Sequence, residues 1–211
     1  DTARVSDSAS KLSGENMAVS TRVFGLVARN WLRDMRKRMY LSPVYRWRYA
    51  GRGIEKLLLA PQDIRTTDPT IANEIFGGRF SLGGSVVVAG NNSPFSVLPP
   101  TRGWQSALLG FGWLRHLRAA DSDIARARAR KLIDDWISVQ GRYHVPSWEP
   151  EITARRIIAW ISHSPLILEG ADRAHYRRFI RSLSRQISYL RRSSLCAPYG
   201  LPKLTCCLAL N

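Results

Sequence analysis

The sequence predicts a mainly α-helical protein built from antiparallel helical hairpins, with one small β-hairpin. Three observations support this fold class. Beyond Pro100, apolar residues recur at intervals of three and four positions, which is the period of an amphipathic helix. The connections between these periodic segments are short, and short connections make successive helices antiparallel. Earlier in the chain, two β-prone runs flank Gly83-Gly84, a pair typical of a two-residue hairpin turn.

The individual elements are indicated by residues that start and stop helices. Asp68-Pro69 combines an N-cap residue with proline at the first helical position, and Gly77-Gly78 ends that short helix. Hairpin strands are expected over 79–82 and 85–89, and 95–98 is expected to add a strand, so the β region spans 79–98. Five helices are expected to follow: from Thr101 through Leu117, from Asp121 or Ser122 to Gly141, from Pro150 to before Pro165, from Asp172 through Leu190, and from about Pro202.

The N-terminal part of the chain divides into two regions. Residues 1–20 are expected to be disordered, because Ser and Asp are frequent and apolar periodicity is absent, whereas residues 21–211 are expected to form a single domain. Within this domain, residues 22–40 predict a basic amphipathic helix that ends before Pro43. Such a helix packs on its own domain or lies on an anionic membrane surface, and the first interpretation is favoured.

The strongest compositional feature is positive charge. Of 211 residues, 32 are Lys or Arg and 16 are Asp or Glu, and 27 of the basic residues are arginine. Arginine favours bidentate binding of carboxylate, sulfate or phosphate, so an anionic partner is one interpretation, and a general preference for arginine over lysine is the other. Three cysteines within 196–207 form no disulfide framework. No apolar run is long enough to cross a bilayer or resembles a signal peptide.

Several motifs of enzyme chemistry are missing from the sequence. It has no phosphate loop, no dinucleotide fingerprint, no His-Glu-x-x-His, no Cys-x-x-Cys and no Gly-x-Ser-x-Gly. We therefore expect no metal and no cofactor, and the motifs identify no catalytic residue.

A candidate binding site begins in the connection 141–150 and continues into the following helix. Tryptophan faces stack on sugar rings and arginine binds carboxylates, so this mixture suits an anionic sugar. A core position is the favoured alternative for Trp160, and Arg156 is expected to need either an internal carboxylate or the ligand as its partner. His116 and His163 are interpreted as capping or surface groups. The candidate substrate-binding residues are Tyr143, His144, Trp148, Arg155, Arg156 and Trp160.

An ordered set of Gly, Trp and Arg motifs resembles a known family. The set begins with Phe76-Gly77-Gly78-Arg79-Phe80 and Phe111-Gly112-Trp113-Leu114-Arg115, followed by Leu132-Ile133-Asp134-Asp135-Trp136-Ile137. It continues with Trp148-Glu149-Pro150-Glu151 and Arg155-Arg156-Ile157-Ile158-Ala159-Trp160. Together these segments resemble the N-terminal region of the heparinase II/III family of bacterial polysaccharide lyases. The resemblance implies that residues 21–211 form a partial (α/α) toroid of antiparallel helical hairpins.

The same resemblance implies a function. Family members cleave uronic-acid-containing polysaccharides by β-elimination without a cofactor, often in the periplasm or cell envelope, and a β-sandwich domain follows the toroid. The family's catalytic residues would lie beyond Asn211, so this chain is expected to be a fragment that binds anionic polysaccharide but is inactive alone. The alternative is a non-enzymatic, Arg-rich helical module that binds nucleic acid or an anionic membrane, with nucleic acid disfavoured. A steep loss of affinity with ionic strength would favour nucleic acid.

Overall fold

The structure, a computed structural model, describes residues 60–142 and 144–211, together with nine helical positions between 24 and 39. Residues 1–20, for which the sequence predicts disorder, lie outside the described residues. At the nine positions the expected N-terminal helix is confirmed. Its apolar side chains are exposed there, so packing of this face on the domain is not seen at these positions. The exposed residues are Phe24, Val27, Trp31, Leu32, Met35 and Met39.

The first part of the body is a short helix followed by a β-hairpin. Helix α3 (Pro69–Phe76) starts where the sequence predicts, because the Asp68 carboxylate accepts a hydrogen bond of 2.8 Å from the Thr70 backbone amide. Strands β1 (Arg79–Leu82) and β2 (Ser85–Val88) pair antiparallel, which confirms the hairpin. The third strand expected over 95–98 is wrong. The chain turns there, and this turn lets the buried Phe95 ring stack on Phe111 at a centroid distance of 5.6 Å.

The hairpin turn contains two glycines with different surroundings. Both have a positive φ, +54° at Gly83 and +78° at Gly84. A Cβ atom on Gly83 would lie 2.8 Å from the backbone carbon of Gly103, whereas a Cβ on Gly84 would have no atom within 4 Å. Gly83 therefore allows the turn to approach the start of the next helix closely, and Gly84 provides only the backbone conformation.

This difference gives a matched pair of mutations. Gly84→Ala should lower the free energy of unfolding by about 1 kcal/mol, because alanine is strained at positive φ. Gly83→Ala should cost about 1–3 kcal/mol more than that, because the added methyl group also meets backbone atoms that cannot move aside. Urea denaturation of the two variants and the parent chain measures both values. Equal losses would contradict the close approach.

The remaining elements are helices with the starts that the sequence predicts. Thr101, Ser122 and Asp172 each accept a hydrogen bond from a backbone amide in the first turn of the helix that follows. The helix expected from Thr101 through Leu117 is wrong, since it is interrupted by Phe111, which has φ of +57° and a fully buried ring. The observed helices are α4 (Arg102–Leu109), α5 (Leu114–Ala119), α6 (Asp123–Gln140), α7 (Pro150–Ser162), α8 (Ser164–Leu168), α9 (Arg173–Ser193) and α10 (Leu201–Leu208), with a short 3-10 turn η2 (Ser194–Cys196).

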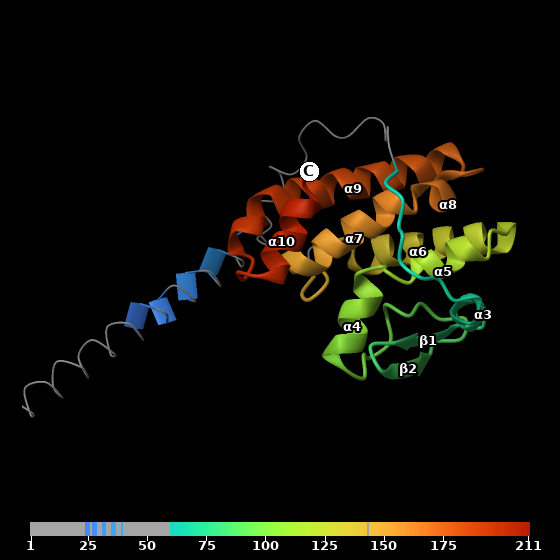
Figure 1. Ribbon diagram of the computed structural model, residues 1–211, viewed down its shortest axis with the longest axis horizontal. Coiled ribbons are helices and arrows are strands. Elements are labelled where there is room, and N and C mark those ends of the chain that lie inside the picture. Colours follow the sequence, from blue (N-terminus) through green and yellow to red (C-terminus); the bar gives the residue numbers. More distant parts are fainter. Residues whose placement is uncertain are drawn as a thin grey trace, which may run out of the picture.

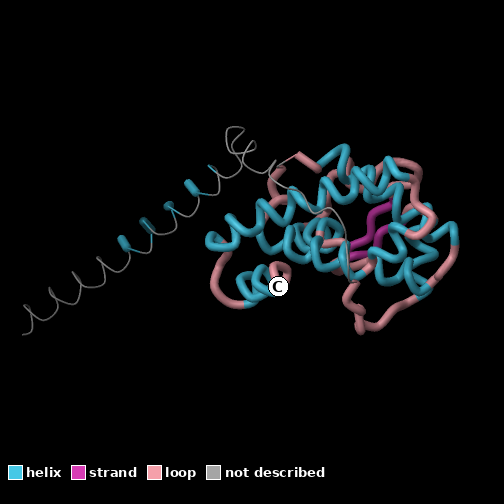
Figure 2. Tube along the Cα trace, turned by 90° about the horizontal axis from the view of Figure 1, so that it is seen from above, coloured by secondary structure: helices cyan, strands magenta, loops and turns pink. Residues whose placement is uncertain are grey.

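Three long helices, α6, α7 and α9, form the centre of the body. Figure 1 shows them stacked, with α7 reversed in direction relative to its two neighbours, as short connections require. The register is fixed by contacts between α6 and α9, where Arg178 donates to Asp134 at 2.8 Å and Arg185 donates to the Gly141 carbonyl at 3.3 Å. Figure 2 shows the two strands confined to one small region within the outline of the helices.

The architecture confirms part of the expected fold class. The described chain is mainly helical with one small antiparallel hairpin, whereas a toroidal arrangement of the helices is not shown. Among the residues that the structure describes, no helix has the length and apolar character needed to cross a bilayer.

Candidate functional site

The structure places three of the six candidate binding residues in the interior. Trp148 is 1% exposed, and Arg156 and Trp160 are fully buried. They lie together in a cluster of aromatic rings that spans the contacts between α6, α7 and α9. The cluster also contains Phe111, Trp136, Phe179 and Tyr189.

Arg156 lies at the centre of this cluster. Its guanidinium donates to Oε1 of Gln186 at 2.7 Å and to the backbone carbonyls of Ser147 and Leu109 at 2.9 and 3.2 Å. Its central carbon lies 4.1 Å from the Trp136 ring centroid, which is within cation–π range. Burial lowers the pKa of Arg156 to about 9, so the group remains charged at neutral pH.

These partners correct the expectation for Arg156. The sequence predicts an internal carboxylate or a ligand anion, but carbonyl oxygens, an amide oxygen and indole faces stabilise this charge. The arginine also fixes the connection between α6 and α7. Ser147 in that connection accepts from Arg156 through its carbonyl and from Trp136 Nε1 through its hydroxyl at 3.0 Å. Trp148, Arg156 and Trp160 therefore stabilise the fold and offer no surface to a ligand.

The other three candidate residues are not brought into this cluster. His144 is exposed in the connection, and Arg155 is about half exposed and forms an ion pair with Glu151 one helical turn earlier. Tyr143 lies outside the described residues. Among the described residues of this region, tryptophans and arginines therefore share no exposed surface.

A different feature, which we call the arginine cleft, lies beside the hairpin. It has a volume of about 780 Å³ and is bordered by residues 61–65, the end of β1, and helices α4, α5 and α7. Arg65, Arg115 and Arg155 line it together with apolar side chains. Figure 1 shows residues 60–68 as an irregular segment that runs across the stacked helices to α3. We call this stretch the 60–68 segment.

Asp63 attaches the 60–68 segment to the body. Its carboxylate accepts from Arg65 Nε at 2.9 Å and Nη2 at 2.6 Å, and Oδ2 lies 3.3 Å from Nε2 of His163 at the end of α7. The hydrogen bonds from Arg65 hold the pKa of Asp63 well below its usual range. The His163 side chain is fully buried, and burial lowers its pKa to about 4, so it is neutral at pH 7.

His116 makes the second attachment. Its Nδ1 accepts a hydrogen bond of 2.9 Å from the Asp68 backbone amide, and burial lowers the pKa of this ring as well. The structure therefore corrects the interpretation of both histidines as surface groups, since both are buried, whereas His163 does occupy the C-cap position of α7. Sequence reasoning missed both, because each contacts a segment about 50 or 100 positions away. For His116, its position on the apolar side of α5 was the available signal.

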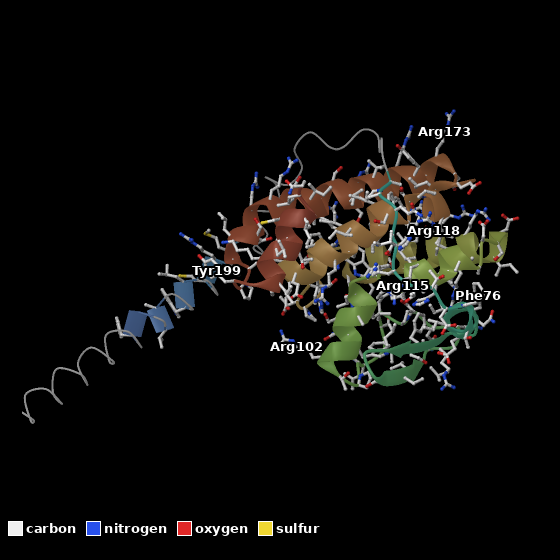
Figure 3. The ribbon with its side chains drawn as sticks, in the orientation of Figure 1. Phe76, Arg102, Arg115, Arg118, Arg173 and Tyr199 are labelled. Carbon is white, nitrogen blue, oxygen red and sulfur yellow. The ribbon has the colours of Figure 1, made fainter. Side chains whose placement is uncertain are left out.

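A third feature, which we call the α9 ridge, is a row of exposed arginines. Arg173, Arg177 and Arg181 follow one another at intervals of four residues, so they extend about 12 Å along one side of the helix. In the part of the chain that the structure describes, none of the three has a carboxylate within 4 Å, whereas neighbouring Arg178 pairs with Asp134. Figure 3 shows Arg173 projecting away from the body at the start of α9. The ridge is therefore an uncompensated positive surface.

Among the described residues, no group of three or more His, Cys, Asp and Glu side chains lies close enough together to hold a metal ion. The three cysteines form no disulfide, and burial raises the pKa of the Cys206 thiol to about 11. The chemistry that the described surface offers is therefore binding of negative charge by arginine.

Comparison with known proteins gives one informative similarity. No protein family and no solved structure matches the chain. The chain is 31% identical over 174 residues to FtsZ-localized protein C of Caulobacter vibrioides. The matched region covers 82% of this chain and 29% of the relative, so the chain spans less than a third of that protein.

This similarity overturns the resemblance to the heparinase II/III family. The relative is named for its localisation with FtsZ and not as a polysaccharide lyase, so the expected lyase activity and anionic polysaccharide partner are corrected. The structure explains the error in physical terms. Four positions that carried the resemblance, Trp136, Trp148, Arg156 and Trp160, form one buried cluster, and such a pattern records packing between helices rather than a reaction.

Proposed function

We propose that this chain is a helical binding module of a cell-division protein and that it associates with FtsZ. The observation that carries the proposal is the 174-residue similarity to FtsZ-localized protein C, which includes most of this chain. The surface chemistry supports a role in binding, because the described residues present arginines along α9 that have no carboxylate partner.

We further propose the α9 ridge as the surface that contacts FtsZ. Arginines four residues apart repel one another and weaken an isolated helix slightly, and Arg173, Arg177 and Arg181 have no carboxylate within 4 Å to offset this among the described residues. An acidic segment of a partner would relieve the repulsion. Exposed charges of this kind increase the rate of association and select partners of opposite sign.

Binding of the purified chain to immobilised FtsZ tests both statements. The parent chain should bind, and binding should weaken as salt increases, because exposed charges are screened. Replacing Arg173, Arg177 and Arg181 with glutamine should reduce the affinity several-fold. The matched control replaces Arg79, Arg102 and Arg118, which are exposed on other elements, and removes the same net charge.

The outcomes separate the two parts of the proposal. No binding by the parent chain overturns the association with FtsZ. Binding that both triple variants weaken equally shows dependence on net charge alone and overturns the α9 ridge as the contact surface. Normal binding by the control and weak binding by the ridge variant supports both statements.

A further inference from the structure

We propose that the arginine cleft binds a small organic phosphate, with its phosphate group held between Arg65 and Arg115. This site is separate from the α9 ridge and does not depend on the association with FtsZ. The argument starts from how the two guanidinium groups are fixed.

Each guanidinium group uses some of its N–H donors in hydrogen bonds within the protein, and its other N–H donors are left for a ligand. Arg65 uses Nε and Nη2 on the Asp63 carboxylate, which leaves Nη1. Arg115 donates from Nε to the Thr66 carbonyl at 3.1 Å and from Nη1 to the Gly112 carbonyl at 2.9 Å, which leaves Nη2 and the second hydrogen of Nη1. The two groups are therefore positioned in advance, and an arriving anion would not have to order them.

The guanidinium groups of Arg65 and Arg115 both lie next to the α-carbon of Gly112. A Cβ atom built on Gly112 would lie 3.6 Å from Nη1 of Arg65 and 3.6 Å from Nη1 of Arg115. The absence of a side chain there leaves room beside both nitrogens, and Gly112, Arg65 and Arg115 all line the cleft.

The charges at this point are not balanced within the described chain. Asp63 is already paired with Arg65, and no described carboxylate lies within 4 Å of the Arg115 guanidinium. Burial lowers the pKa of Arg115, the charge of Arg65 lowers it further, and the charge of Asp63 raises it, so repulsion between the two cations is only partly offset. A phosphate monoester carries close to two negative charges and three acceptor oxygens, which suits two guanidinium groups better than a single carboxylate does.

The remaining walls indicate what the phosphate is attached to. Ile71, Leu82, Trp113 and Ile158 contribute apolar surface to the same cleft, whose volume of about 780 Å³ is in the range of sites for small organic ligands. An apolar or aromatic group joined to the phosphate would bury against these residues. The cleft therefore fits an organic phosphate better than inorganic phosphate.

Titration calorimetry with phenyl phosphate, inorganic phosphate and benzoate tests the proposal on the full chain. Phenyl phosphate should bind more tightly than either of the other two. Arg115→Gln should weaken phenyl phosphate binding by about tenfold or more, because a charge-assisted hydrogen bond is lost. The matched control Arg191→Gln removes an equal charge from the exposed last turn of α9 and should leave the affinity unchanged.

A second variant keeps every arginine. Gly112→Ala places a methyl group in ordinary contact with both guanidinium groups, so the chain should fold, but the methyl group occupies the space that the phosphate needs. Unfolding midpoints like that of the parent chain establish that the variants are folded. No binding of phenyl phosphate by the parent, equal affinity for benzoate or inorganic phosphate, or full affinity in a folded Gly112→Ala variant would each overturn the proposal.

Discussion

Replacing Arg156 with methionine should lower the free energy of unfolding by roughly 3–5 kcal/mol. Methionine fills much of the volume but cannot donate hydrogen bonds, so the carbonyls of Ser147 and Leu109 and the amide oxygen of Gln186 would lose a buried donor. Breaking a buried charged network by removing one member costs about this much. The contact with the Trp136 ring is lost as well. Equilibrium denaturation in urea, followed by tryptophan fluorescence, measures the loss.

The neighbouring residue provides the control for this prediction. Arg155 is about half exposed, and its ion pair with Glu151 lies on the helix surface. Arg155→Met should change the free energy of unfolding by less than about 1 kcal/mol, because surface ion pairs contribute little. Similar effects at the two positions would show that the buried hydrogen bonds of Arg156 do not stabilise the fold.

Acidification should destabilise the protein through His163. Burial lowers the pKa of this histidine from 6.5 to about 4 in the folded chain, so between these values the unfolded chain binds more protons than the folded chain. The stability contributed by neutral His163 is therefore complete above pH 6.5 and is lost as the pH falls towards 4. A difference of this size corresponds to about 3 kcal/mol. Asp63, whose pKa is also lowered, adds a loss in the same direction at still lower pH.

Denaturation curves recorded between pH 7 and pH 4 test this dependence. His163→Gln cannot take up the proton, so its free energy of unfolding should fall much less steeply over this range than that of the parent chain. His144→Gln is the matched control, since His144 is exposed in the connection before α7. If the parent and the His163 variant showed the same slope, the buried histidine would not be the source of acid sensitivity.

Local signals in the sequence predicted most of the helices. Asp68, Thr101, Ser122 and Asp172 each cap the helix that they were expected to start, because capping depends on residues within one turn. The same local reasoning failed at Phe111. Its burial requires a positive φ that interrupts an otherwise regular helical pattern, and the energy that stabilises this backbone comes from rings elsewhere in the core.

The candidate site was harder to predict than the fold. Periodicity places Arg156 beside the apolar side of its helix, but its carbonyl and amide partners come from α4, α9 and the connection before α7. The arginine cleft depends on contacts between residues 61–68 and helices up to about 100 positions away, namely Asp63 with His163 and Asp68 with His116. No pattern within a short window of sequence contains that information.

One border of the arginine cleft belongs to neither a helix nor a strand. Residues 61–65 are positioned by side-chain contacts of Asp63, whereas the opposite border consists of packed helices. Displacement of this border requires no change in the helices, so the shape of the entrance is adjustable independently of the rest of the molecule.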